Sequence, residues 1–394
     1  PTRGQMRIAT GLGTHWFGYR PVPPSAPEIR MHPWPAAADF KKKLAVDSMF
    51  GKDVDMPENV CQIAVAQLEY GKARRVFEAG AGEGLICLSA PAQEEELARF
   101  IVEHRIQHAV VGVERYAGPL YDALPRGGVL ARFGVGHDGI DKERATSRGI
   151  LCTNTPGVLD DSVAELTVGL MLAAARHLPD VSAATGAGTW GPRVGSELRD
   201  KTLAVIGCGA IGRRVARIAA RGLGMHVVGC EVVPVDKERL RIEYGFAEIR
   251  DQFADAVADA DYVTLHIPST ADTRHYVNHA RLALMKPCSW LINTARGALV
   301  CEADLYDALS AGRITGAALD VFEHEPYQPI MPDKDLRQLP RVIMSPHIGS
   351  STQEACDRMA SRALTNIRMA EAGEFATMDL LNPAVLNRKE HDPT

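Results

Sequence analysis

The chain alternates short apolar runs with longer stretches in which apolar residues recur at helical spacing. The runs have the length and β-branched character of buried parallel strands, and the stretches between them are typical of amphipathic helices. We therefore predict an α/β protein with a small parallel sheet followed by a larger sheet of six strands. The predicted strands are residues 85–88, 109–113, 129–133 and 149–154 in the first sheet, and 203–206, 226–230, 262–267, 290–293, 316–320 and 342–344 in the second.

One predicted helix stands out from the others. Residues 162–178 are largely apolar and begin in an Asp-Asp-Ser capping region. A helix that is apolar on most faces must be buried, so we expect it to join two domains or to pack in a dimer. The other predicted helices cover residues 94–104, 119–124 and 213–223, and lie around Phe253, Arg281 and Leu305.

The N-terminal part follows a different pattern. Residues 7–10 are compatible with a first strand, but residues 19–60 lack periodicity and contain seven prolines. This composition predicts an extended, looped segment whose apolar residues pack on another surface. A surface arm without any chemistry is the simpler alternative.

The strand predicted at 203–206 leads directly into a dinucleotide-binding motif. Gly207, Gly209 and Gly212 form G-x-G-x-x-G, with Cys208, Ala210 and Ile211 between them. In such a motif the first glycine makes the turn, the second lets the backbone approach a pyrophosphate, and the third lets the helix pack on the strand. Glu231 ends the next strand, 19 residues past Gly212, where a carboxylate accepts ribose hydroxyls. A tight turn without ligand is the alternative.

A second glycine-rich stretch, residues 77–84, resembles the loop of S-adenosylmethionine-dependent methyltransferases. That loop needs a strand before it and a long alternating α/β domain after it, whereas the run that follows here, residues 85–88, is itself strand-like. We therefore interpret it as a turn between two strands.

Composition narrows the class of protein. A chain of 394 residues favours two domains. The net charge of −5, from 44 basic and 49 acidic residues, gives no electrostatic reason to expect nucleic acid or a membrane surface as a partner. No apolar run is long enough to span a bilayer, and the start carries no signal pattern, so we expect a soluble, cytoplasmic protein. The eight cysteines form no C-x-x-C and are expected to be reduced packing residues, without disulfides or a metal site.

Reactive residue types follow several strands at the edge where ligands bind in an open parallel sheet. His347 has the pKa range of a proton donor near neutrality, Glu325 can stabilise its charged form, and Arg296 can clamp a carboxylate and polarise a carbonyl. Taken singly, each has an ordinary alternative: a buried histidine, a loop charge and a surface ion pair. At the end of the first sheet, the glycine-rich residues 134–141 expose backbone N–H groups that suit a small oxyanion.

These motifs resemble those of the D-isomer-specific 2-hydroxyacid dehydrogenase family, over roughly residues 105–385. The family's N-x-x-R-G appears at Asn293–Gly297, its G-A-x-x-D-V-F-x-x-E-P at Gly316–Pro326, and its P-H-I-G at Pro346–Gly349. The resemblance implies that Arg296 orients the substrate, that His347 is the acid/base, and that Glu325 supports it. It also implies that backbone amides at Val135 and Gly136 bind the substrate carboxylate. Cofactor contacts are expected from Thr294, Ala295, Asp320, His266, Pro268 and Gly349.

The resemblance also implies an architecture. It predicts two Rossmann-like, doubly wound parallel-sheet domains, with the NAD-binding domain, residues 158–349, inserted into a flavodoxin-like substrate domain made of residues 1–157 and 350–394. The last helix, about Gln353 to Glu371, should then return to the N-terminal half. A homodimer is expected.

Some positions differ from the usual residues of the family or add candidates to the site. Asp160 stands near the expected nicotinamide position, where relatives often have a small or hydroxylated residue, so we include it among the cofactor contacts. Glu231 replaces the more usual Asp, and its charge repels a 2′-phosphate, which favours NAD over NADP. Arg115 and Tyr116 follow the strand at 109–113 and are candidates for reading the far end of a small anionic substrate.

The leading hypothesis is an NAD-dependent oxidoreductase that interconverts a D-2-hydroxyacid and its 2-oxoacid. A dehydrogenase of the same fold that acts on phosphite or a phosphonate is the first alternative, because an arginine and an amide loop bind phosphorus oxyanions equally well. A non-catalytic NAD-binding regulator is the second.

Overall fold

Five parallel strands form the first sheet of the computed structural model, which describes residues 61–80 and 84–387. The order β2-β1-β3-β4-β5 is the flavodoxin-like arrangement that we predicted. Strand β1 was not predicted, whereas the other four correspond to predicted runs. The predictions for residues 1–60 lie outside the described residues. The strands are β1 Cys61–Ala66, β2 Leu85–Ala90, β3 His108–Val111, β4 Val129–Arg132 and β5 Leu151–Thr153.

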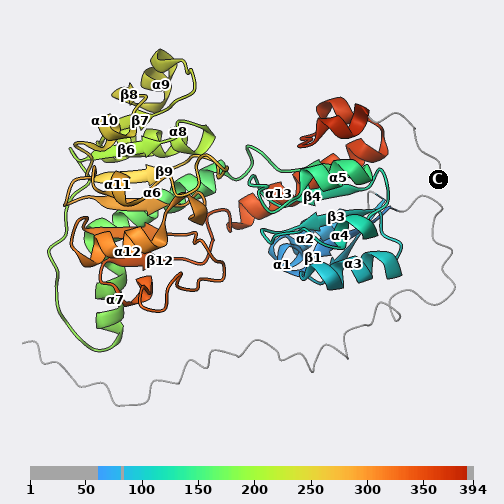
Figure 1. Cartoon of the computed structure of the whole chain (residues 1–394), viewed down its shortest axis with the longest axis horizontal. Helices are drawn as coiled ribbons and strands as arrows, with labels where there is room; N and C mark the ends of the chain where they lie inside the picture. The colour runs from blue at the N-terminus through green and yellow to red at the C-terminus, as the bar shows by residue number, and fades with distance from the viewer. Residues whose placement is uncertain (1–60, 81–83, 388–394) are drawn as a thin grey trace, which may run out of the picture. The chain divides into compact units, whose positions relative to one another are not determined.

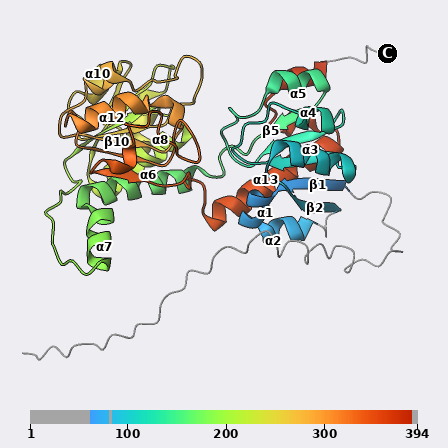
Figure 2. The ribbon, with the colours of Figure 1, turned by 60° about the horizontal axis from the view of Figure 1, so that its bottom comes forward.

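Helices from both ends of the described chain cover this sheet. The long helix α13 (Gln353–Glu371) begins at Thr352, whose side chain accepts the N–H of Ala355, and packs against β4, α1 and α2. Figures 1 and 2 show α13, in red, beside α1 and α2, in blue. The last helix thus returns to the N-terminal part of the described chain, as the family resemblance implies. The other helices are α1 Gln67–Lys72, α2 Arg74–Ala79, α3 Glu94–Glu103, α4 Leu120–Ala123 and α5 Lys142–Arg148.

The prediction for residues 77–84 was wrong in one respect. We expected a turn between two strands, but residues 77–79 are the end of helix α2, and strand β2 begins directly after residue 84. Phe77 of α2 is buried against the core of the first sheet. Gly80 caps the end of α2, and Gly84, with a φ of 81°, directly precedes β2.

The second sheet has seven parallel strands in the order β12-β11-β10-β9-β6-β7-β8. The order reverses between β6 and β9, which is the switch point where a doubly wound sheet binds its ligand. We predicted six of these strands and missed β8, a short edge strand. The strands are β6 Thr202–Ile206, β7 His226–Cys230, β8 Glu248–Arg250, β9 Tyr262–Leu265, β10 Trp290–Asn293, β11 Gly316–Leu319 and β12 Val342–Met344.

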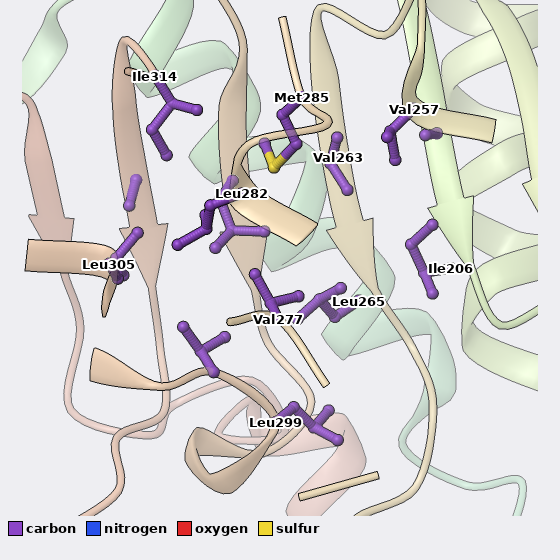
Figure 3. Close-up of a cluster of buried hydrophobic side chains, with 14 of the residues drawn as sticks. Ile206, Val257, Val263, Leu265, Val277, Leu282, Met285, Leu299, Leu305 and Ile314 are labelled. Atoms are coloured by element: carbon purple, nitrogen blue, oxygen red, sulfur yellow. The ribbon is translucent and has the colours of Figure 1, made fainter. Parts of the chain in front are cut away.

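Aliphatic side chains fill the space between this sheet and its helices. Ile206, Val263 and Leu265 of the strands and Leu282 and Leu305 of the helices belong to one cluster of buried side chains (Figure 3). The helix predicted at 213–223 starts three residues earlier, at Ala210, and continues from Arg217 into a π-helical turn, Ile218–Gly222. The helices are α8 Ala210–Arg217, α9 Lys237–Tyr244, α10 Phe253–Val257, α11 His279–Leu282 and α12 Glu302–Ser310, with 3-10 turns at Gly297–Leu299 and Leu336–Gln338.

Helix α6 (Asp160–Arg176) belongs to both hydrophobic cores. Val163 packs in the core of the first sheet, whereas Ala164 and Met171 pack in a core of the second. The helix thus contributes side chains to the cores of both sheets, which agrees with one of its two predicted roles. His177, with a left-handed φ of 54°, ends α6 and precedes the next helix, α7 (Leu178–Gly186). None of the side chains of α7 is buried.

The chain after α13 closes the edge of the first sheet. Leu380 forms a bridge with Thr153 of β5, and the side chain of Asn382 accepts the N–H of Cys152 and donates to the carbonyl of Ile150. Two 3-10 turns, Phe375–Thr377 and Pro383–Asn387, flank this contact. None of the helices in the described residues combines the length and apolar character needed to cross a membrane.

Candidate active site

The turn after β6 has the geometry of a dinucleotide-binding turn. Gly207 has a φ of 97°, and a Cβ there would lie 2.6 Å from the carbonyl oxygen of His266. A Cβ on Gly212 would lie 2.1 Å from the carbonyl oxygen of Gly207, so the helix packs directly on the turn. At Gly209 a Cβ would meet no atom within 4 Å, which leaves the backbone open to an approaching phosphate. Ala210 and Ile211 then form the first turn of α8.

Glu231 lies against this turn. One carboxylate oxygen accepts the N–H of Cys208 at 2.9 Å, and the other accepts the N–H of Val233 at 3.1 Å. The carboxylate is thus held at the end of β7, beside the second residue of the glycine motif. This position suits a contact with an adenosine ribose.

The other predicted cofactor residues differ in their surroundings. His266 ends its strand with Nε2 3.0 Å from the hydroxyl of Thr264, and burial lowers its pKa to about 3, so its ring is neutral. Pro268 is exposed beyond it. Asp160 is buried at the start of α6 and pairs with Arg214 of α8, 3.0 Å away. Asp160 therefore has an ion-pair partner within the protein, on the helix that follows the glycine turn.

His347 and Glu325 are in direct contact. Nδ1 of His347 lies 2.6 Å from Oε2 of Glu325, while Oε1 of Glu325 accepts the N–H of Phe322 at 3.0 Å. Because Nδ1–H donates a hydrogen bond to the carboxylate, Nε2 is the ring atom left to exchange a proton with a substrate. Both side chains keep part of their surface exposed, at 26% for His347 and 30% for Glu325.

Asp320 has a role that we did not predict. We expected it at the nicotinamide, but its buried carboxylate accepts the hydroxyl of Ser345 at 2.6 Å and the N–H groups of Ile348 and Gly349 at 2.9 and 2.8 Å. Burial raises the pKa of Asp320, and the three donors oppose that rise. Asp320 therefore orders the loop that carries His347, whose backbone φ of 51° is unusual for a residue other than glycine.

Arg296 is held on a turn with little freedom. The side chain of Asn293 donates to the carbonyl of Arg296 and accepts the N–H of Ala295, at 2.8 and 3.1 Å. The hydroxyl of Thr294 lies 2.8 Å from that of Thr167 in α6. A Cβ on Gly297 would lie 1.9 Å from the carbonyl carbon of Phe322, so only glycine permits this approach. The turn that carries Arg296 is thereby pressed against the loop that carries Glu325.

The guanidinium of Arg296 reaches the glycine-rich loop of the first sheet. Its Nε donates to Asp138 at 2.9 Å, and a Cβ on Gly136 would lie 1.0 Å from its Nη2. Burial raises the pKa of Asp138, but the neighbouring Arg296 outweighs that effect and holds it below its ordinary value. The side chain of Asn154 donates to the carbonyl of Val135 at 2.8 Å, which holds the glycine-rich loop in place. The predicted clamp and the predicted amide loop are therefore in contact.

Arg115 and Tyr116 differ from each other. Arg115 is exposed after β3, whereas Tyr116 is 1% exposed and donates its hydroxyl to Glu114 at 3.2 Å. Tyr116 is thus a core residue and presents no surface to a ligand, so we remove it from the candidate site.

Several residues with positioning roles escaped the sequence analysis. Asn293 opens the N-x-x-R-G motif, so the motif itself contained the signal, and Ser345 directly precedes the P-H-I-G motif. Asp138 and Asn154 carried no signal, because each acts through a contact between segments far apart in the chain.

Comparison with known proteins places this geometry in context. Residues 168–349 match the family model described as D-isomer specific 2-hydroxyacid dehydrogenase, NAD binding domain. The chain is 38% identical to a glyoxylate reductase of Thermococcus litoralis over 278 residues, covering 68% of this chain and 80% of that protein.

Two further relatives complete the comparison. A D-3-phosphoglycerate dehydrogenase of Methanocaldococcus jannaschii is 42% identical over 250 residues, which are 63% of this chain but only 46% of that longer protein. The structure of an NADPH-dependent glyoxylate/hydroxypyruvate reductase from Sinorhizobium meliloti, in complex with NADP and malonate, superposes with a TM-score of 0.68 at 29% identity. It covers 84% of this chain and 99% of that one.

Proposed function

Because the chain belongs to the D-isomer-specific 2-hydroxyacid dehydrogenase family, we propose that it is an NAD-dependent oxidoreductase that interconverts a D-2-hydroxyacid and its 2-oxoacid. The observation that carries this proposal is the pairing of His347 with Glu325 at 2.6 Å, on a loop next to the turn of Arg296. A proton donor and an anion clamp are the two groups that reduction of an oxoacid requires.

The residues present fit a dinucleotide. Gly209 leaves open backbone at the start of α8, where the helix dipole favours a pyrophosphate, and Glu231 is placed for the ribose. When bound, the nicotinamide supplies the hydride for reduction and accepts it in the reverse direction.

The protein's own groups account for the rest of the reaction. Arg296 and the amides of Val135 and Gly136 hold the substrate carboxylate and orient the adjacent carbonyl. Nε2 of protonated His347 gives its proton to the carbonyl oxygen as the hydride reaches the carbon, which yields the hydroxyl group. Glu325 stabilises the imidazolium before the transfer and fixes the ring orientation throughout.

A panel of substrates tests this function. Purified protein is mixed with NADH and, separately, with glyoxylate, hydroxypyruvate, pyruvate and longer 2-oxoacids, and NADH oxidation is followed by absorbance. Turnover of at least one oxoacid, with the D-hydroxyacid as product, supports the proposal. Turnover with phosphite or a phosphonate and NAD alone would replace it with the phosphorus alternative, and NADH binding without any turnover would favour a regulator.

The proposed preference for NAD depends on Glu231. We expect Glu231→Ser to lower the ratio of the KM for NADPH to the KM for NADH by roughly tenfold or more, because the change removes the charge that repels a 2′-phosphate. Steady-state kinetics with both cofactors measure this ratio. Glu238→Ser, an exposed acid on α9, is the control and should leave the ratio unchanged. An unchanged ratio in Glu231→Ser would contradict the role assigned to this carboxylate.

The proposed homodimer uses the apolar surface formed by α7 and the segment after it. Leu178, Trp190 and Val194 are 50%, 88% and 95% exposed, and α7 buries none of its own residues. Such exposure of large apolar side chains is typical of a protein–protein interface. We expect Trp190→Ser to shift the chain from dimer to monomer in light scattering coupled to gel filtration. Val232→Ser, an exposed apolar residue outside this surface, should leave the mass unchanged.

A further inference from the structure

Three glutamates gather behind the His347–Glu325 pair. Glu302 begins helix α12, and Glu323 and Glu325 lie in the loop after β11. Glu302 and Glu323 brace each other reciprocally: the N–H of Glu302 donates to Oε1 of Glu323 at 3.1 Å, and the N–H of Glu323 donates to Oε1 of Glu302 at 2.6 Å. The brace ties the first turn of α12 to the loop that presents Glu325.

The three carboxyls differ in the positive charge available to them. Glu325 has His347 at 2.6 Å, and Glu323 has His275 at 2.7 Å with Arg274 at 3.5 Å. Within residues 61–80 and 84–387, no lysine, arginine or histidine forms an ion pair with Glu302. Two of the acids therefore have a basic side chain close to the carboxylate, and Glu302 has none among these described residues.

Glu302 is also the most enclosed of the three. Its relative exposure is 4%, and its Oε2 is buried without any hydrogen-bond partner. An ionised oxygen in that position would lose its hydration and gain nothing in return, which is strongly unfavourable. Burial, followed by repulsion from Glu323 and Glu325, raises the pKa of Glu302 from 4.5 to about 7, against the hydrogen bond from the Glu323 N–H.

We propose that Glu302 still holds a proton at mildly acidic pH, where an ordinary glutamate is ionised, and acts as a positioning residue, because its neutral carboxyl lets Glu325 keep a charge against His347 without repulsion from Glu302. The proton resides on the Oε2 side, while Oε1 continues to accept the Glu323 N–H. When Glu302 ionises, three like charges share one small region and the loop that carries Glu325 is destabilised. The titratable groups that face this region are Glu323, Glu325, Tyr327, Cys301 and Asp304, with His275, Arg274 and His347 paired to the first two.

The pH dependence of thermal stability tests whether Glu302 is protonated, without any measurement of activity. Between pH 4.5 and about 7, the folded state keeps a proton on Glu302 that the unfolded chain has released, so the stability that Glu302 provides falls as pH rises. Glu302→Gln mimics the neutral acid at every pH. We expect the Tm of the variant, minus that of the wild type, to rise by roughly 2–4 °C from pH 5 to pH 8.

A matched control separates this effect from any loss of a carboxyl in the first turn of a helix. Glu354→Gln removes an exposed acid from the first turn of α13 and should give a Tm difference that is constant with pH. If the difference for Glu302→Gln were also constant, or fell with pH, Glu302 would be ionised in the folded protein and the inference would be overturned.

Kinetics test the positioning role, and this arm rests on the proposed function. At pH 6.5 we expect Glu302→Gln to keep kcat within about threefold of the wild type, because the amide oxygen still accepts the Glu323 N–H. Glu302→Ala removes that acceptor and should lower kcat about tenfold, with the NADH Kd unchanged. A glutamine variant as slow as the alanine variant would overturn the positioning role. Absence of turnover in the wild type would instead contradict the proposed function and leave the thermal result decisive for the proton.

Discussion

Replacement of His347 by asparagine should lower kcat for oxoacid reduction by roughly 10²–10⁴-fold, the usual contribution of a positioned acid. Its Nε2 is the ring atom free to meet a carbonyl oxygen, since Nδ1 is engaged by Glu325. Asparagine is the replacement of choice because His347 has a φ of 51°, a left-handed conformation that asparagine tolerates better than alanine. The substitution therefore removes the acid without straining the loop.

Binding and a neighbouring histidine provide the controls for this experiment. NADH affinity, measured by fluorescence titration, should be unchanged, because the glycine turn and Glu231 lie on other strands. His324→Asn changes an exposed histidine in the same loop as Glu325 and should leave kcat within about twofold. Wild-type turnover in the His347 variant would refute the assignment of the proton donor.

Gly136→Ala should lower kcat/KM for the oxoacid by roughly 10²-fold or more, a loss that a displacement of about 1 Å at a reacting centre can produce. The new Cβ would lie 1.0 Å from Nη2 of Arg296, so the guanidinium must leave its place over the loop. The methyl group also shields the backbone amide that we assign to the substrate carboxylate. Steady-state kinetics at varied oxoacid concentration measure the loss.

The control for this substitution is another glycine of the same half of the chain. A Cβ on Gly71 in α1 would meet no atom within 4 Å, and Gly71→Ala should leave kcat/KM and Tm close to those of the wild type. NADH affinity should be retained in both variants. A Gly136→Ala enzyme with unaltered kinetics would mean that Arg296 and the amide loop do not hold the substrate together.

Most strands were predictable because burial on both faces of a parallel sheet produces near-continuous apolar runs. Strands β1 and β8 did not produce such a signal. Cys61–Ala66 is rich in alanine and follows a proline-rich region without periodicity, and its place between β2 and β3 decides its conformation. Glu248–Arg250 is an edge strand of charged residues that is defined only by its backbone pairing with β7.

The candidate site was predictable where strand topology sufficed. His347, Glu325 and Arg296 follow strands of one parallel sheet, so their approach to a common edge follows from the strand order. The positions of Asp320 and Tyr116 depend on which way a side chain turns at a strand end, and spacing along the chain does not specify that. Asp138 and Asn154 depend on the meeting of two segments distant in sequence, which only the folded chain reveals.

Helix α13 and the segment at Leu380 and Asn382 follow both sheets in the chain, and this order matters during synthesis. The five strands of the first sheet precede the second sheet in the chain, but the helix that covers them and the backbone that pairs with β5 are translated after it. Until then an apolar face and an unpaired strand edge stay open, which is the condition under which nascent chains associate wrongly. The second sheet is translated before α13, so the first sheet obtains its covering helix only after the strands of the second sheet have been made.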